Sequence, residues 1–271
     1  MHYSEYIPIA PLQRIVKTIW VLEDVSSTGS DYEKIFPDCC AEMIFHGSDP
    51  MWQRENNESV KQERHFVYGQ ISKFIELRSV KKVFVIGVKF YPWGLSSLSD
   101  IPQYEMQQYR VAIPDIFKNA DACIQEKIDC TKPVEQKIGL IQQFLLKILL
   151  ARKNRFSNDS LEYAVSQIQQ SDGLQKIASI SDRLNISTRE LERRFKKYIG
   201  ISPKQMSRIY RFQSALQLKD TASSLTDIAH AAGYYDQSHF IREFKDIAGI
   251  NPNIFFNKEQ KLTEAFINYA E

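Results

Sequence analysis

The second half of the chain has apolar residues at helical spacing, separated by polar ones. Leu161, Val165 and Ile168 recur at i, i+4 and i+7, and Asp172-Gly173 follows as a stop signal. The same spacing continues toward the C-terminus and predicts further helices. An earlier amphipathic helix is predicted over 134–148, and its apolar face is either a dimer seam or is buried in its own domain.

Residues 1 to about 110 show a different pattern, with short runs of β-branched and aromatic residues broken by prolines. The predicted strands are Ile15–Leu22, Glu42–Phe45 and Val83–Phe90. The polar stretch Asp49–Arg64 is predicted to be a loop. Several short strands with frequent breakers indicate an antiparallel barrel or sandwich.

The helical half contains a repeat whose copies start 49 residues apart, at Ser187 and Asp236. Residues 187–203 read STRELERRFKKYIGISP, and residues 236–252 read DQSHFIREFKDIAGINP. The matched pairs are Arg193 and Arg242, Phe195 and Phe244, Lys196 and Lys245, Gly200 and Gly249, and Pro203 and Pro252. A match kept in one register indicates one structural unit present twice.

Each copy is predicted to be a capped helix behind a shorter helix and a tight turn. Ser187 and Glu190 have the spacing of a capping box, and Asp236 can cap the second copy. The shorter helices and their turns are predicted at 176–184 with Asn185-Ile186, and at 225–232 with Gly233. A helix, a short turn and a capped second helix form the helix-turn-helix layout.

A long helix is predicted between the two units. Ser202 suits the N-cap and Pro203 the first helical position, and about 17 residues follow, which span roughly 25 Å. Such a helix can hold two recognition helices about one turn of B-DNA apart, roughly 34 Å.

The face opposite the apolar stripe of each copy carries long polar side chains, which can reach base edges. The predicted base-contacting residues are Arg189, Glu192, Arg193, Lys196, Gln237, Ser238, His239, Arg242 and Lys245. The predicted phosphate contacts are Lys197, Lys204 and Arg208. The whole chain has a net charge of only +2, but residues 187–211 hold eight Lys and Arg against two Glu. For one helix alone, the alternative is that these charges form a solvated face. Because the polar face is repeated in register, DNA binding is favoured.

The quoted motifs, with IYRFQSALQL between them, resemble the AraC/XylS family of bacterial transcriptional regulators over about residues 158–257. The second unit, DIAHAAGYYDQSHFIREFKDIAGINP, is nearly complete, although Asn185 stands where the family often has Gly and Tyr234 where it often has Phe. The resemblance implies two helix-turn-helix subdomains on a long helix, with both recognition helices in successive major grooves. It implies base contacts from the positions of Arg189, Glu192, Arg193, Gln237, Ser238, His239 and Arg242.

The N-terminal part is similar to the cupin-type sensor domain of the same family. PDCCAEMIF at 37–45 resembles a Pro-Asp-Gly segment with Cys39 in place of Gly, and GVKFYPWG at 87–94 resembles a Gly-rich turn with Trp93 in place of Gly. The resemblance implies a domain that binds a small effector, dimerises, or does both.

The predicted fold class is therefore α+β with two domains, which a length of 271 residues allows. A cupin-like β barrel or sandwich with flanking helices precedes an all-α domain of two helix-turn-helix subdomains joined by a long helix. The predicted limits are 1–157 for the sensor or dimerisation domain (β-rich to about 110 and helical over 111–157), 158–260 for the DNA-binding domain, and 261–271 for a tail.

Other chemistry finds little support in the sequence. Cys39, Cys40, Cys123 and Cys130 form no CxxC pair, so buried free thiols are expected rather than a zinc or redox site. A metal-dependent cupin would need converging imidazole and carboxylate ligands, and His46 is expected to be a core or loop residue. No catalytic residue, metal site or cofactor is predicted. No signal peptide or apolar run of about 20 residues is found, so a cytoplasmic protein without a membrane partner is expected.

The predicted function is sequence-specific binding of double-stranded DNA by a transcriptional regulator, controlled by a small-molecule effector or by dimerisation through the N-terminal domain. The expected partners are promoter or operator DNA, with RNA polymerase, an effector and a second copy of the chain as further candidates. The alternatives are a protein-interaction module and a metal-dependent cupin enzyme fused to a DNA-binding domain. Activation and repression are not distinguishable from these patterns.

Overall fold

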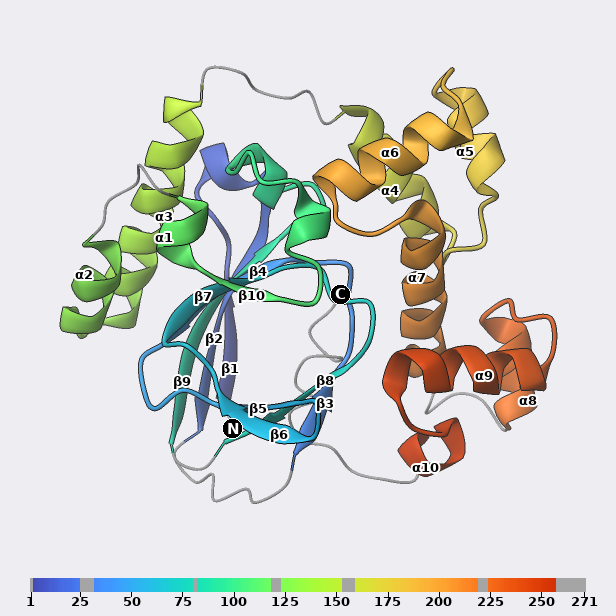
Figure 1. Cartoon of the computed structure of the whole chain (residues 1–271), viewed down its shortest axis with the longest axis horizontal. Coiled ribbons are helices and arrows are strands. Elements are labelled where there is room, and N and C mark those ends of the chain that lie inside the picture. Colours follow the sequence, from blue (N-terminus) through green and yellow to red (C-terminus); the bar gives the residue numbers. More distant parts are fainter. Residues whose placement is uncertain are drawn as a thin grey trace.

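The computed structural model describes residues 2–24, 32–79, 82–117, 123–152, 159–218 and 224–256. A β-rich N-terminal part packs beside a helical C-terminal part, and α7 (Pro203–Gln217) runs along the border between them (Figure 1). The predicted domain limit at 157 and the predicted tail at 261–271 lie outside the described residues.

Two antiparallel sheets build the N-terminal part. The six-stranded sheet has the order β1 (His2–Tyr6), β2 (Val16–Asp24), β9 (Val83–Phe90), β4 (Glu42–His46), β7 (His65–Tyr68) and β10 (Arg110–Ala112). The four-stranded sheet has the order β3 (Glu33–Ile35), β8 (Ile75–Arg78), β5 (Trp52–Glu55) and β6 (Glu58–Lys61). The three predicted strands are confirmed as β2, β4 and β9.

Both faces of the six-stranded sheet are covered, which explains why its central strands are apolar without alternation. Along β2, Ile19 and Val21 point into the core shared with the helices of the N-terminal part. Trp20 and Leu22 point the other way, into a cluster shared with Ile75 and Leu77 of the four-stranded sheet. Successive side chains of a strand point to opposite faces, so one strand serves two cores.

The prediction of a loop over Asp49–Arg64 is wrong, because this segment contains the hairpin of β5 and β6. Asn56 and Asn57 form its turn with φ of 49° and 67°. A two-residue hairpin turn of this kind needs positive φ at both positions, and Asn tolerates it. The polar side chains of β5 and β6 conceal the strands because most of them face solvent, whereas Gln53 is buried.

Three helices cover the outer face of the large sheet: α1 (Ile113–Ile116), α2 (Ile124–Cys130) and α3 (Val134–Ala151) (Figure 1). Short 3-10 turns lie at η1 (Ala10–Leu12), η2 (Leu95–Ser97) and η3 (Gln103–Glu105). Ile138, Ile141 and Leu145 of α3 are buried in the core of their own domain. The alternative of a dimer seam through these side chains is therefore wrong, because the sheet covers them.

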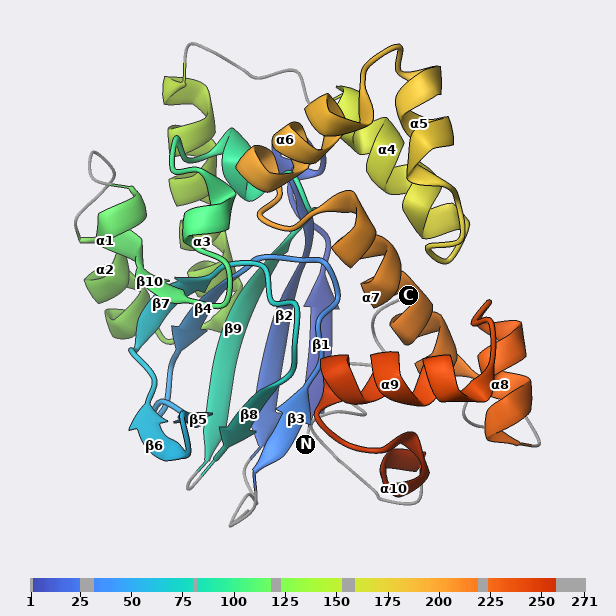
Figure 2. The same ribbon diagram turned by 45° about the vertical axis from the view of Figure 1, so that its right-hand side comes forward.

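The C-terminal part contains two helix-turn-helix units, as predicted. Its helices are α4 (Asp159–Gln170), α5 (Ile177–Arg183), α6 (Thr188–Tyr198), α7, α8 (Leu225–Ala231), α9 (Gln237–Ala248) and α10 (Pro252–Phe256). Helices α5 and α6 form the first unit, α8 and α9 form the second, and α7 connects them (Figure 2). No helix within the described segments is long and apolar enough to cross a membrane.

The four cysteines divide into two classes. Cys39 and Cys40 are buried, whereas Cys123 and Cys130 are exposed, and none of the four forms a disulfide. Burial raises the pKa of the Cys40 thiol to about 12 and that of Cys39 well above its ordinary value. The expectation of buried free thiols is confirmed for the first pair and wrong for the second.

Replacing either repeat-equivalent phenylalanine, Phe195 or Phe244, with alanine is expected to lower the free energy of unfolding by about 3–5 kcal/mol. Both rings are fully buried, each in the core of its own unit. Urea unfolding followed by circular dichroism measures the loss. Tyr235→Ala is the control, because its side chain is 87% exposed, and it should change stability by no more than about 0.5 kcal/mol. A loss at either phenylalanine no larger than the control's would contradict the packing described.

Two of the four thiols are expected to react with a chromogenic disulfide reagent in the native protein, because Cys123 and Cys130 are exposed. Cys39 and Cys40 should remain unreactive at pH 8, since burial both blocks access and disfavours the thiolate, which is the reactive form. All four should react in guanidinium chloride. More than two rapid equivalents from the native chain would show that the region of Cys39 and Cys40 opens to solvent.

Candidate DNA-binding faces and an internal pocket

The start of each recognition helix is fixed by a side-chain cap. In α6, Ser187 Oγ accepts the backbone N–H of Glu190 at 3.1 Å, and in α9, Asp236 Oδ1 accepts that of His239 at 2.7 Å. The prediction of a full capping box at Ser187 is wrong in its second half, because the Glu190 carboxylate accepts from Arg193 and Arg194 instead. Both recognition helices nevertheless begin where the repeat predicts.

The full capping box belongs to α7. The N–H of Gln205 donates to Ser202 Oγ at 3.1 Å, and the N–H of Ser202 donates to Gln205 Oε1 at 3.0 Å. Pro203 occupies the first helical turn, as predicted. The start of the helix that separates the two units is therefore specified locally.

The turns of the two units have the same backbone conformation. Asn185 has φ of 53° and Gly233 has φ of 74°. Asn is the residue other than Gly that most readily adopts this left-handed region, so Asn185 fits the turn in which Gly is frequent. Behind the first turn, Ser181 is buried and its hydroxyl lies 3.1 Å from that of Thr188, which lets α5 approach α6 closely.

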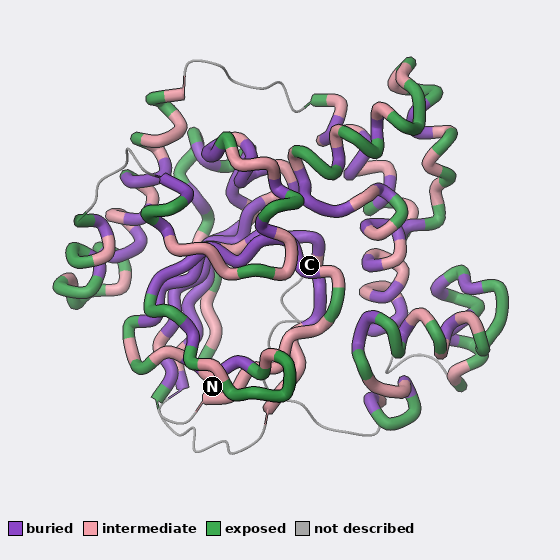
Figure 3. The backbone as a smooth tube through the Cα atoms, in the orientation of Figure 1, coloured by how far each residue is buried: buried purple, intermediate pink, exposed green. Residues whose placement is uncertain are grey.

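The predicted base-contacting side chains lie on the outer faces of α6 and α9. Figure 3 shows that both helices alternate between buried and exposed positions along their length. Eight of these residues are exposed and His239 is intermediate; the exposed ones are Arg189, Glu192, Arg193, Lys196, Gln237, Ser238, Arg242 and Lys245. These side chains are thus accessible in the free protein, and two of them, Arg193 and Lys196, line a hollow shared with Tyr104 of the N-terminal part.

Arg193 carries an internal partner on this face. Its guanidinium donates two hydrogen bonds of 2.8 Å to the Glu190 carboxylate, which also accepts from Arg194. These hydrogen bonds hold the pKa of Glu190 down at about 2. The carboxylate is therefore ionised at neutral pH and occupies Nε and Nη2 of Arg193.

The three predicted phosphate-contacting residues differ in their surroundings. Lys197 and Lys204 are exposed. Arg208 instead donates to Glu243 at 2.9 Å and to Asp246 at 2.7 Å, both on α9. A contact from Arg208 to phosphate requires these ion pairs to open.

The N-terminal part touches both recognition helices at equivalent positions of the repeat. Gly200 and Gly249, which end α6 and α9, have φ of 102° and 62°. A Cβ on Gly200 would lie 3.0 Å from the backbone oxygen of Gln103, and one on Gly249 would lie 2.0 Å from the Phe74 ring. The backbone N–H of Phe74 also donates to the Ile247 carbonyl at 2.9 Å. Glycine therefore allows the two ends to dock against the N-terminal part.

A further contact joins the two parts through the segment 36–39. The Phe36 ring meets Phe212 and Phe255 edge-on, with centroids 5.4 Å apart in each pair. Gln213 of α7 donates to the Pro37 carbonyl. Cys39 has φ of 62° and is buried in the core of the first helix-turn-helix unit. The only sequence signal for this docking was the resemblance that placed Cys39 where a Gly is expected.

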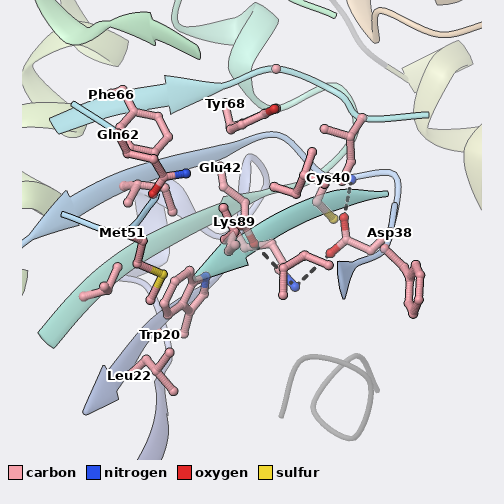
Figure 4. Close-up of a pocket in the computed structure, with 18 of the residues that line it drawn as sticks. Trp20, Leu22, Asp38, Cys40, Glu42, Met51, Gln62, Phe66, Tyr68 and Lys89 are labelled. Atoms are coloured by element: carbon pink, nitrogen blue, oxygen red, sulfur yellow. Dashed lines mark hydrogen bonds and ion pairs between the residues drawn. The ribbon is translucent and has the colours of Figure 1, made fainter. Parts of the chain in front are cut away.

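An internal pocket lies between the two sheets (Figure 4). The volume open to the centres of water-sized molecules is about 100 Å³. One water needs about 10–15 Å³ by the same measure, so the pocket can hold several. Its lining is mainly apolar and includes Trp20, Leu22, Met51, Phe66, Ile75 and Leu77. A Cβ on Gly87 would lie 2.0 Å from the Trp20 ring, so the absence of a side chain there lets the indole lie against β9. The pocket was not predicted as a site from the sequence.

Three charged side chains form a cluster in this pocket. Lys89 Nζ is 2.8 Å from Asp38 Oδ2 and 3.5 Å from Glu42 Oε1 (Figure 4). Burial raises the pKa of Glu42 to about 7, despite the nearby ammonium. Burial alone would lower the pKa of Lys89, but the two carboxylates outweigh it and raise that pKa, so Lys89 stays protonated.

A hydrogen-bonded chain of neutral polar groups adjoins another side of the pocket, which His46, Gln62 and Tyr68 line. His46 Nε2 lies 3.1 Å from Gln62 Oε1, Gln62 donates to Gln53, and Gln53 donates to the Tyr68 hydroxyl. Burial lowers the pKa of His46 to about 4, so its imidazole is neutral. His46 is 1% exposed, which confirms a core position. Among the described segments, no three His, Cys, Asp or Glu side chains are grouped as metal ligands.

Two sequence families match this chain. One, described as a helix-turn-helix domain, matches residues 180–258, and the other, described as a domain of unknown function, matches residues 4–112. The HTH-type transcriptional activator RhaS of Pectobacterium carotovorum is 32% identical over 68 residues, which are 25% of this chain and 24% of that protein. The HTH-type transcriptional regulator GbdR of Pseudomonas aeruginosa is 36% identical over 70 residues, 26% of this chain and 19% of that protein. The chain thus spans about a quarter of the length of such relatives, or less.

Solved structures of other proteins also align with this chain. ToxT from Vibrio cholerae aligns with 95% of this chain and 98% of its own, at a TM-score of 0.48 and 13% identity. The C-terminal domain of AraT from Geobacillus stearothermophilus aligns with 37% of this chain and 86% of its own, at a TM-score of 0.35 and 28% identity.

The similarity to these regulators rests on the helical half of the chain. It has two helix-turn-helix units whose recognition helices match in register, a long helix between them, and sequence matches to named regulators of one type. Residues 180–258 match a helix-turn-helix domain and are similar to transcriptional regulators of the AraC/XylS type.

Proposed function

We propose that this protein is a transcriptional regulator that binds a specific sequence of double-stranded DNA with α6 and α9. The observation that carries this proposal is the equivalence of the two outer faces. Arg193 and Arg242 occupy the same position of the repeat, both are exposed, and α7 separates the helices that present them. Two such helices joined through one long helix suit two successive major grooves.

Each face offers side chains that distinguish base pairs. Arg193 and Arg242 can bond guanine O6 and N7 bidentately, and Gln237 can bond adenine in the same way. Glu192 can accept from cytosine N4 but is repelled by nearby phosphate. We assign the remaining base contacts to Arg189, Lys196, Ser238, His239 and Lys245. Lys197 and Lys204, and Arg208 once it leaves α9, would contact phosphates.

The N-terminal part is proposed to be a cupin-like sensor that extends to about residue 157, followed by a DNA-binding domain over 158–260. A small molecule in the pocket would alter DNA affinity only if it prefers one arrangement of the two parts. Phe36 and Gln213 support this coupling, because both line the pocket and both contact the opposite part. As a regulator of promoters the protein would act in the cytoplasm, with RNA polymerase and a second copy of the chain as candidate partners.

The double variant Arg193→Ala, Arg242→Ala is expected to lose about 2–6 kcal/mol of specific binding free energy, roughly 1–3 per lost base contact. The target is a labelled fragment from upstream of the protein's own gene, titrated with excess random DNA over a range of salt. If that fragment carries no site, a selection from random sequences supplies one for the same titration.

The matched control is Arg54→Ala, Arg64→Ala, which removes the same charge from exposed or half-exposed arginines of the N-terminal part. It should leave specific binding unchanged. Equal binding by the wild type and the first variant would show that the assigned faces do not read DNA. Binding by every chain only at low salt would show a non-specific electrostatic contact and would favour a protein-interaction module instead.

A further inference from the structure

We infer that the pocket between the two sheets binds a small organic cation, an ammonium group attached to an apolar or aromatic body. This inference names the effector class of the proposed function and rests on that function for its regulatory meaning. Four features of the pocket support this inference: its balance of charge, the accessibility of each charged group, the rings in its wall, and an unused polar atom.

The acidic side chains that line the pocket outnumber its one ammonium. Asp38 and Glu42 share one ammonium, that of Lys89, so the fully ionised set carries one negative charge in excess. A buried carboxylate without its own counter-ion is costly. The raised pKa of Glu42 fits a carboxyl group whose burial one shared ammonium does not offset. A second cation in the pocket would pair with it.

The two carboxylates are also more accessible than the ammonium. The side chains of Asp38 and Glu42 are 24% and 23% exposed, whereas that of Lys89 is 5% exposed. Both carboxylates line the pocket. A ligand therefore meets carboxylate oxygens, while an anion would find the ammonium already covered by two acidic groups.

The walls suit the rest of such a ligand. Trp20, Phe66 and Tyr68 bring aromatic rings to the pocket from β2 and β7, and Met51 and Leu22 add apolar surface (Figure 4). Aromatic faces attract organic cations through the ring quadrupole, most strongly where water is excluded. This mainly apolar lining favours a ligand with a compact hydrocarbon body over a polyhydroxylated one.

One polar atom of the wall is unused. His46 is 1% exposed and lines the pocket, and its Nδ1 has no hydrogen-bond partner within the described residues. Its Nε2 is already taken by Gln62. A neutral imidazole at this place can form one hydrogen bond with a ligand, which adds a point of specificity away from Glu42.

The site is also placed to influence DNA binding. Gln213 belongs to α7, and Phe36 packs against Phe212 of the same helix. Both line the cavity that holds Asp38 and Glu42. A ligand that fills the cavity therefore presses on residues that fix α7 against the N-terminal part.

The test is isothermal titration calorimetry of the full chain with three probes of one shape: 2-phenylethylammonium, 2-phenylethanol and 3-phenylpropionate. The cation is expected to bind at least tenfold more tightly than the alcohol and the anion. Glu42→Gln should weaken cation binding by about tenfold or more. Glu58→Gln is the control, because Glu58 is exposed on β6, and it should change nothing.

Preference for the anion, or binding of none of the three probes, would overturn the inference, and so would an unchanged affinity in Glu42→Gln. If Glu42→Gln does not fold by circular dichroism, Asp38→Asn takes its place with the same expectation. The DNA titration separates this inference from the proposed function. Cation binding without specific DNA binding would support the pocket site and contradict the proposed function. Specific DNA binding without cation binding would support the proposed function and contradict the inference about the pocket.

Discussion

The contact of the Phe36 ring with α7 and α10 is the interaction on which the rest of the arrangement depends. Phe36 follows β3, lines the internal pocket and packs edge-on against Phe212 and Phe255. One side chain thus belongs both to the wall of a cavity and to the core of the second helix-turn-helix unit. Because interiors are densely packed, a change in the shape of the cavity is transmitted to α7 rather than absorbed.

Several arginines of the helical C-terminal part are held in ion pairs. In the free protein, Glu190 holds Arg193 and Arg194, while Glu243 and Asp246 hold Arg208. Lys73 of the N-terminal part joins Asp246 at 3.2 Å. Such partly exposed ion pairs are individually weak, about 0–1 kcal/mol, so DNA can replace them at little cost. The N-terminal part therefore contacts α9 through Asp246, the carboxylate that also holds Arg208, one of the predicted phosphate contacts.

Much of the helical half could be predicted from the sequence, because each signal there is local. The caps at Asp236 and Ser202, the stop at Gly249 and the buried rings of Phe195 and Phe244 follow from spacing alone. The hairpin of β5 and β6 could not be predicted, because its strands are short and mostly polar on the outside. The Glu190 carboxylate can accept from the Ser187 backbone N–H or from Arg193 and Arg194, and spacing does not decide between them.

The pocket, and the contacts of the N-terminal part with the ends of α6 and α9, could not be predicted from the sequence for a different reason. Asp38, Glu42 and Lys89 come from two strands and a loop, and only the strand order brings them together. Phe74 and Gln103 meet the ends of α9 and α6 across about 100 residues or more of chain. Long-range contacts of this kind leave no periodic signal. Gly200 and Gly249 are the partial exception, because their equivalence marked two helix ends whose contacts proved to be alike.

The contacts of Phe36, Phe74 and Gln103 hold the two recognition helices in one relation to the N-terminal part. The most direct measurement is the distance distribution between spin labels at Lys196→Cys and Lys245→Cys, which occupy equivalent exposed positions of α6 and α9. The chain would carry Cys123→Ser and Cys130→Ser so that only these sites are labelled. A single narrow distribution that broadens when Phe36→Ala and Phe74→Ala are added is the predicted result. A distribution that is broad from the start, or that these two substitutions leave unchanged, would contradict the account.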